Sequence, residues 1–132
     1  MMQYAKKLTI ALSLLLSFTT ANVAQAHHSF PAQYDINKPA TKSGIVTKVD
    51  WRNPHVYLFM DVSNSDGSVS EWSFELANVS AMRSRGWDKN TVQAGDLLEA
   101  SGSLARDGSP LLNATEIKRQ GGEQLLRSGS RL

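Results

Sequence analysis

The central part of the chain alternates between apolar and polar residues in the way that is typical of β-strands. In the first such segment, which begins at Thr41, one face carries mostly apolar side chains: Ile45, Thr47, Val49 and Trp51. A period of two residues predicts a strand with one buried face. Gly44 lies within this segment and can allow a bend or a bulge. We therefore expect a half-buried strand that ends near Trp51.

Two further strands are expected on either side of the turn-forming sequence Asn-Ser-Asp-Gly. From His55 to Val62 the chain is nearly all apolar, which indicates that both faces are at least partly covered. From Val69 to Leu76 apolar and polar residues alternate regularly, and the polar face carries carboxylates. The intervening residues have the chemistry of a hairpin turn. The two segments therefore predict a hairpin with one solvated face.

A short helix and two more strands complete the pattern. Asn78 can cap a helix that runs to about Arg85, and Gly86 can adopt the left-handed conformation that ends it. Strands are expected at 96–104 and 111–119. Three strands, a helix and two strands is the order of the oligonucleotide/oligosaccharide-binding (OB) barrel. We therefore predict an all-β domain with one short helix, built as a small five-stranded Greek-key (OB-like) barrel; a generic antiparallel barrel or sandwich is the alternative.

The amino terminus has a different character. Lys6 and Lys7, an apolar stretch and the small residues Ala24 and Ala26 together form the pattern of a secretory signal peptide over residues 1–26. The apolar stretch is too short to span a bilayer stably, so we expect no stable membrane anchor after cleavage near Ala26; an uncleaved anchor is the alternative. The sequence thus predicts a periplasmic or secreted protein.

Three segments are expected in the chain that follows the leader. Residues 27–40 contain two prolines and no sustained period, which predicts an extended arm rather than a helix. Residues 41–119 hold the five expected strands and form the barrel domain. Residues 120–132 are polar and contain glycine, which indicates a flexible tail.

Charge and cysteine content narrow the function classes. The formal net charge of +2 comes from Lys6 and Lys7, and the remaining chain has 12 basic and 12 acidic residues. A neutral, mixed surface argues against a nucleic-acid partner. The chain has no cysteine, so the domain must be held by its core rather than by disulfides, and a thiolate metal site is excluded.

Several short motifs follow the leader: His27-His28-Ser29-Phe30, Gly44-x-Val46-x-x-Val49-x-Trp51-x-Asn53-Pro54-His55, Trp72, Gly86-Trp87, Gly95-Asp96 and Asp107-Gly108. In this combination the chain resembles a widespread family of short exported bacterial proteins known only as a domain of unknown function. The resemblance implies export and a β-rich fold, and it supplies no catalytic residue. The tail beyond Gln120 matches this family poorly.

The three histidines of the chain are candidate metal ligands. Cleavage after Ala26 would place His27 and His28 at a new amino terminus, where an α-amine and imidazoles are available together. His55 could complete the site. Nitrogen-rich tetragonal sites suit copper(II), followed by zinc or nickel. The alternative is that the pair merely follows the cleavage site and that His55 is hydrogen-bonded inside a turn.

Aromatic side chains suggest a second kind of site. Tyr57 and Phe59 lie on the outward face of their expected strand and are candidates for a surface that stacks on a sugar or another planar ligand. Trp51 and Trp72 share the inward phase and are assigned to the core.

Catalytic motifs are missing from the sequence. The carboxylates Asp61, Glu71 and Glu75 are interpreted as the solvated face of the hairpin. There is no nucleophile elbow and no phosphate-binding loop. We therefore expect a non-catalytic exported module that binds a small ligand or a periplasmic protein near Trp51 to His55. The alternative is a periplasmic copper-binding protein that uses His27, His28 and His55.

Overall fold

The fold is known from a computed structural model, which describes residues 29–127. The expected signal peptide, His27, His28 and residues 128–132 lie outside the described range. In chain order the elements are α2 (Phe30–Gln33), β1 (Tyr34–Asp50), β2 (Tyr57–Ser63), β3 (Val69–Glu75), α3 (Val79–Ser84), β4 (Leu97–Ala105), β5 (Leu111–Arg119) and β6 (Gln124–Arg127). Within residues 29–127, no helix is long and apolar enough to cross a membrane.

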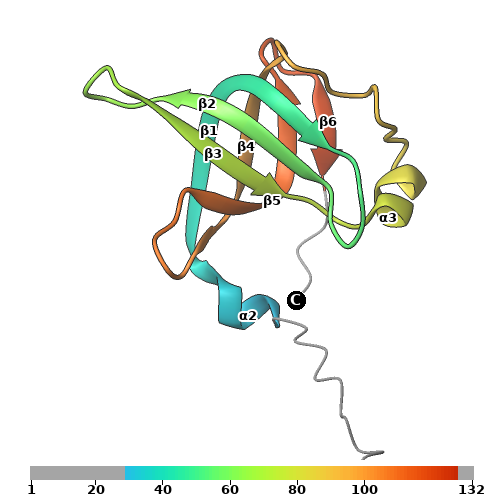
Figure 1. Ribbon diagram of the computed structural model, residues 1–132, viewed down its shortest axis with the longest axis horizontal. Helices are drawn as coiled ribbons and strands as arrows, with labels where there is room; N and C mark the ends of the chain where they lie inside the picture. Colours follow the sequence, from blue (N-terminus) through green and yellow to red (C-terminus); the bar gives the residue numbers. More distant parts are fainter. Residues whose placement is uncertain (1–28, 128–132) are drawn as a thin grey trace, which may run out of the picture.

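The strands close into a barrel (Figure 1). Antiparallel pairing gives the order β3-β2-β1-β4-β5-β6, and a parallel pairing between β3 and β5 joins the two sides. This closing contact runs from Ser73 opposite Leu111 to Glu75 opposite Asn113. Helix α3 connects β3 to β4. The pairing and the element order are those of the five-stranded OB barrel, so the predicted fold class is confirmed.

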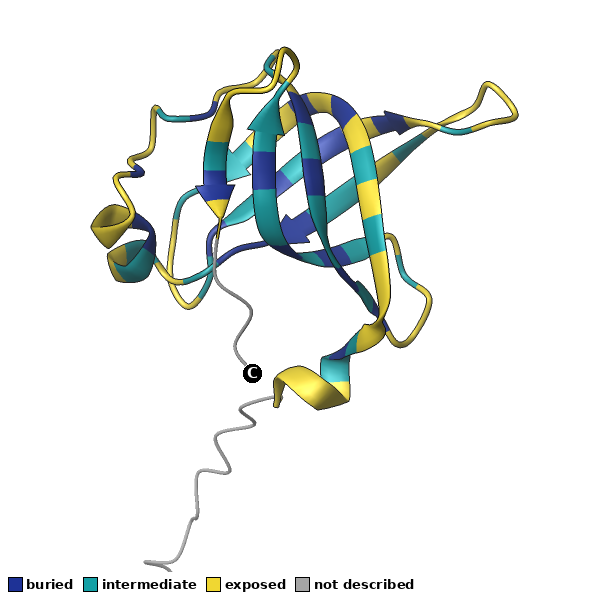
Figure 2. Cartoon of the chain, turned by 180° about the vertical axis from the view of Figure 1, so that it is seen from behind, coloured by how far each residue is buried: buried dark blue, intermediate teal, exposed yellow. Residues whose placement is uncertain are grey.

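The core fills the inside of this barrel, and the buried residues alternate along its strands (Figure 2). On β2 and β3 the inward side chains Leu58, Met60 and Phe74 have no exposed surface. Met82 of α3 is equally buried, and the Asn78 side chain accepts a hydrogen bond from the Ala81 amide at 2.8 Å, as expected for its cap. The helix thus covers one side of the barrel core.

The first strand differs from its predicted phase. Ile45 is 51% exposed whereas Val46 is 1% exposed, the reverse of the expected order. A register shift between Val46 and Lys48 inserts one extra residue opposite β2. Such a bulge turns the following residues over, so Val49 and Trp51 do face the core as expected. The predicted inward phase is therefore right after the bulge and wrong before it.

Both segments that flank the expected barrel contain regular structure. Residues 30–33 form the short helix α2, where an extended arm was expected. Pro31 does not prevent this helix, because proline is tolerated in the first helical turn. The next residue, Tyr34, already begins β1 and pairs with Ala105. In the segment expected as a tail, β6 pairs with β5 and buries Leu126. Gly-Gly at 121–122, with both φ angles positive, makes the turn that allows this pairing.

Candidate functional site

Glu75 stands at the end of β3 and is only 5% exposed. It lies on the outer face of the strand, opposite the buried Phe74, where a solvated carboxylate was expected. Glu71 on the same face is exposed, as expected. The interpretation of Glu75 as part of a solvated face is therefore wrong. A buried carboxylate is costly unless its charge is compensated by hydrogen-bond donors.

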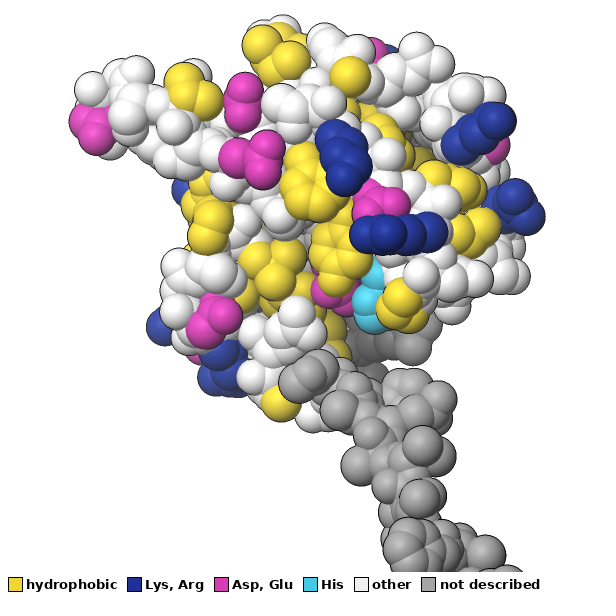
Figure 3. Space-filling view, viewed as in Figure 1, with side chains coloured by type: hydrophobic (Ala, Val, Ile, Leu, Met, Phe, Trp, Pro, Cys, Tyr) yellow, Lys and Arg dark blue, Asp and Glu magenta, His cyan; other side chains and the backbone are white. Residues whose placement is uncertain are grey.

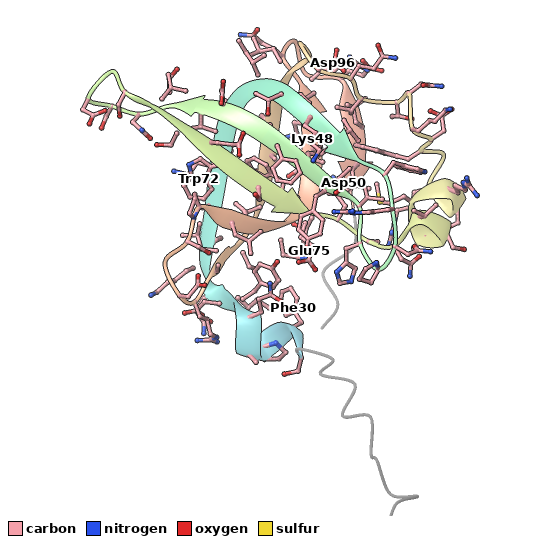
Figure 4. All side chains as sticks on the ribbon, viewed as in Figure 1. Phe30, Lys48, Asp50, Trp72, Glu75 and Asp96 are labelled. Atoms are coloured by element: carbon pink, nitrogen blue, oxygen red, sulfur yellow. The ribbon has the colours of Figure 1, made fainter. Side chains whose placement is uncertain are left out.

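Two tyrosine hydroxyls and one imidazole bind this carboxylate. The Tyr34 and Tyr57 hydroxyls donate to Oε2 at 2.5 and 2.7 Å, and His55 Nδ1 lies 2.8 Å from Oε1. The Phe30 ring packs on the Tyr34 ring with 5.3 Å between centroids, so α2 covers the cluster from below (Figure 4). We call Tyr34, His55, Tyr57 and Glu75 the carboxylate cluster.

Backbone pairing explains why residues far apart in sequence meet here. Tyr57 lies directly opposite Glu75 in the antiparallel pair of β2 and β3. The residues just before β2 continue this pairing, because the Val56 carbonyl accepts a hydrogen bond from the Leu76 amide at 2.8 Å. His55 thereby lies next to Glu75, and its side chain remains 45% exposed. One edge of the imidazole is held by the carboxylate while the ring stays accessible.

The carboxylate cluster changes the acid–base behaviour of its tyrosines. Burial raises the pKa of Tyr34 and of Tyr57 above the usual 10.0. The hydrogen bond to Glu75 and its negative charge raise the pKa of both phenols further. Both phenols therefore keep their protons in the folded protein at a pH at which the unfolded chain has lost them.

This difference predicts a loss of stability at alkaline pH. Because the folded pKa is raised, the stability linked to each phenol is fully present below pH ~10 and is lost as the pH rises above it. Urea unfolding at pH ~9 and ~11 should show a smaller loss for Tyr57→Phe than for the wild type. Equal losses would contradict the proton linkage.

The ultraviolet absorbance of tyrosinate provides an independent control. Tyr4 lies in the expected leader, so Tyr34 and Tyr57 are the only tyrosines of the processed protein. Their ionisation should be delayed beyond pH ~10 and should appear together with unfolding.

A shallow hollow of about 430 Å³ adjoins the carboxylate cluster on the outer face of β2 and β3. It is lined by Asp50, Arg52, Tyr57, Phe59, Ser73, Ser109, Pro110 and Leu111. The Tyr57 and Phe59 rings are 6.4 Å apart with 31° between their planes. Figure 3 shows hydrophobic side chains gathered in the middle of this face, with basic side chains and the described histidine beside them.

Charged groups border the two rings. The Lys48 ammonium lies 5.2 Å from the centre of the Phe59 ring. Arg52 is bound to Asp50 at 2.7 Å, and its side chain is 75% exposed. Lys48 and Asp50, labelled in Figure 4, belong to β1 and lie opposite Phe59 and Tyr57 of β2 in the pairing of the two strands. The hollow therefore combines an aromatic floor with one lining cation, Arg52, and a second cation, Lys48, over the Phe59 ring beside it.

The structure shows where the candidate residues named from the sequence lie. Tyr57 and Phe59, the expected stacking residues, line the hollow. Trp51 and Trp72 pack against the core, as assigned.

Of the expected metal ligands only His55 is described. Between residues 29 and 127 there is no group of three or more His, Asp or Glu side chains that could hold a metal ion. The metal site thus stays a prediction.

Sequence reasoning missed Tyr34 and Glu75. Tyr34 lies 41 positions from Glu75, and only the closure of the barrel brings the two together. The one available signal was the outward position of Glu75 beside an apolar strand that contains Tyr57. That signal does not distinguish a buried carboxylate from a solvated one.

The chain matches a family model and is similar to several solved structures. Residues 14–112 match the model of a family described as "Family of unknown function (DUF6152)". A search of curated proteins gave no significant match. Among solved structures, the mitochondrial single-stranded DNA-binding protein Rim1 from S. cerevisiae matches with 12% identity and a TM-score of 0.47, over 69% of this chain and 96% of that one.

Two further structures are similar at the same level. The N-terminal domain of PriB from Thermoanaerobacter tencongensis has 11% identity and a TM-score of 0.46, with 64% of this chain and 97% of that one covered. The ZRD-deleted mutant of TiaS in complex with agmatine has 16% identity and a TM-score of 0.43, with 72% and 26% covered. These values carry no argument about what the present chain binds.

The expected exclusion of a nucleic-acid partner nevertheless has to be withdrawn, although no such partner is assigned to this chain. The yeast neighbour is, by its title, a single-stranded DNA-binding protein. A balanced count of acidic and basic residues is therefore not sufficient ground for excluding this class of partner. The reason is that net charge does not report how charges are distributed over a surface.

Proposed function

The chain belongs to the family of unknown function DUF6152, and we propose that its barrel is an exported, non-catalytic module that binds a small ligand in the hollow beside Tyr57 and Phe59. One observation carries this proposal: two partly exposed aromatic rings and several polar side chains share one concave surface. Ligand sites of this kind combine apolar contact area with a few polar groups that orient the ligand.

The position of the hollow supports the same role. OB barrels bind ligands on the face of their second and third strands and on the loops beside it. Here β2 supplies the rings, β3 supplies Ser73, and the turn before β5 supplies Ser109. The Tyr57 hydroxyl is engaged by Glu75, so its ring is held in place before a ligand arrives. A surface ordered in advance loses less entropy on binding.

Export is the second part of the proposal. Lys6, Lys7 and the small residues before His27 support a cleaved leader. Protein recovered from the periplasmic fraction of a Gram-negative host should begin at His27, as measured by intact mass. Retention of residues 1–26 would contradict this part.

Ligand binding is tested by a fragment screen on the ¹⁵N-labelled processed protein. Neutral sugars, aromatic amides and aromatic carboxylates are added in turn. We expect at least one of these probes to shift the amide resonances of Tyr57, Phe59 and Ser73 in a saturable way. Phe59→Ala should weaken that binding by about 10-fold, because stacking on one ring contributes ~1–3 kcal/mol.

The matched control is Ile45→Ala. Ile45 is an exposed apolar residue that lines a different hollow, and its replacement should leave the affinity unchanged. Shifts confined to other faces, or no shifts with any probe, would contradict the proposal.

A second candidate function, copper binding, is favoured by the orientation of His55. Histidines that bind metals usually donate their other ring N–H to a carboxylate, which fixes the ring. Glu75 is such a carboxylate for Nδ1, and in the described part of the chain no hydrogen bond of Nε2 is found. Phe30, two residues after His28, packs into the same cluster through Tyr34. These contacts support a copper(II) site formed by His27, His28 and His55.

Copper binding is tested by titrating the processed protein with copper(II). His55→Ala should weaken binding by about 10-fold or more, because one imidazole ligand is lost. A form with one extra residue ahead of His27 should also bind more weakly, because the α-amine is moved away from the imidazole. Unchanged affinity in the extended form would rule out the terminal α-amine as a ligand.

A further inference from the structure

We infer that the ligand of the hollow is a planar anion, in the simplest case an aromatic carboxylate. Its ring would stack on Phe59 and Tyr57, and its carboxylate would pair with Lys48 and Arg52. The inference rests on the proposed ligand-binding role of the hollow and names the chemical class that the hollow selects.

The charged groups around the hollow differ in whether they form ion pairs. Glu75 does not line the hollow, and its carboxylate oxygens are bound by Tyr34, Tyr57 and His55. Asp50 is bound to Arg52 at 2.7 Å. Among residues 29–127, no carboxylate lies within salt-bridge distance of Lys48, whose ammonium lies over the Phe59 ring. An anion in the hollow would therefore meet an unpaired positive charge.

The same face orients the ligand. Asp61 and Glu71 are exposed and lie opposite each other on β2 and β3, at the far end from Arg52. Like charges repel, so the anionic group of a ligand is directed away from this pair and toward Lys48 and Arg52. Arg52 is held by Asp50 yet is largely exposed, so donors of its guanidinium remain accessible.

Aromatic and ionic contacts favour the same ligand class. A ligand ring can stack on Phe59 because the lysine stem is flexible and its ammonium can move aside. After this movement the Lys48 ammonium forms an ion pair with the ligand carboxylate at the edge of the stacked rings. A neutral ring gains only the stacking, and a cationic ligand would be repelled by Lys48. Charge-assisted contacts are about twice as strong as neutral ones.

The experiment compares salicylate with its neutral analogue salicylamide on the processed protein. Calorimetry and amide shifts should give an affinity about 10-fold higher for salicylate, equivalent to ~1.4 kcal/mol. Lys48→Gln should abolish this preference while salicylamide binding stays unchanged. The matched control is Lys42→Gln, because the Lys42 ammonium lies 4.4 Å from the centre of the Trp72 ring, another cation–aromatic pair. That variant should retain the preference.

The outcomes separate the inference from the proposed function. If both compounds bind at Tyr57 and Phe59 with equal affinity, the hollow is a ligand site and the inferred anion class is wrong. The same conclusion follows if Lys48→Gln leaves the preference intact. If only neutral sugars shift these amides, the site selects another class. If no probe binds, the ligand-binding function itself is wrong, and the inference with it.

Discussion

Replacement of Glu75 by alanine is expected to lower the free energy of unfolding by about 3–5 kcal/mol, because removing one member of a buried charged network is strongly destabilising. The variant would leave the buried Tyr34 hydroxyl without its acceptor and would free Tyr57 and His55. It would also leave a small cavity between α2 and the end of β3. Each of these consequences acts in the same direction.

Urea denaturation followed by tryptophan fluorescence measures this effect. Glu71→Ala is the matched control, since Glu71 lies on the same face of β3 and is exposed. Its effect should stay within about 0.5 kcal/mol, as for most surface substitutions. Glu75→Gln should fall between the two, because the amide keeps the shape and one acceptor. Similar stabilities of the two alanine variants would show that the carboxylate cluster contributes little to folding.

The second large effect is expected for Gly102→Ala in β4. Gly102 lies at a register shift in the pairing with β5, where the two backbones approach closely. A Cβ atom at this position would collide with the Asn113 carbonyl oxygen and would crowd the Leu112 side chain. The barrel can relieve the overlap only by moving one backbone. We expect a loss of at least ~3 kcal/mol, at the upper end of the range for overpacking.

Thermal unfolding monitored by circular dichroism measures this loss. Ser101→Ala is the control, because Ser101 is the neighbouring residue in β4 and its hydroxyl shares an exposed hydrogen bond of 2.8 Å with the Thr41 hydroxyl. Its effect should not exceed about 1 kcal/mol. A Gly102→Ala variant as stable as Ser101→Ala would mean that β4 and β5 can separate at little cost.

Residue patterns were sufficient for most of the secondary structure. Alternation over 69–76 and the apolar run over 55–62 predict β3 and β2, because a strand with a buried face needs apolar residues at every second position. Asn78 and Gly86 mark the two ends of α3 through local capping chemistry. The element order in turn predicts the barrel, since few topologies close such a set of strands.

Short-range patterns did not reveal every element. Helix α2 is only four residues long, and β6 depends on pairing with β5. The bulge that reverses the phase of β1 lies after Val46, whereas the sequence marked only Gly44 as a place for a bend or a bulge. Each of these features is stabilised by contacts with distant residues. Alternation of residue types along the chain cannot report such contacts.

By itself, the sequence determined the five strands of the barrel and the outward position of Tyr57 and Phe59, because these follow from local periodicity and hydrophobic burial. The tertiary structure alone decided that Glu75 is buried and that Tyr34, His55 and Tyr57 bind it. It also decided that Lys48 lies over Phe59 at the edge of the hollow. The protonation and charge of a side chain depend on the groups around it in space, and only barrel closure brings those groups together.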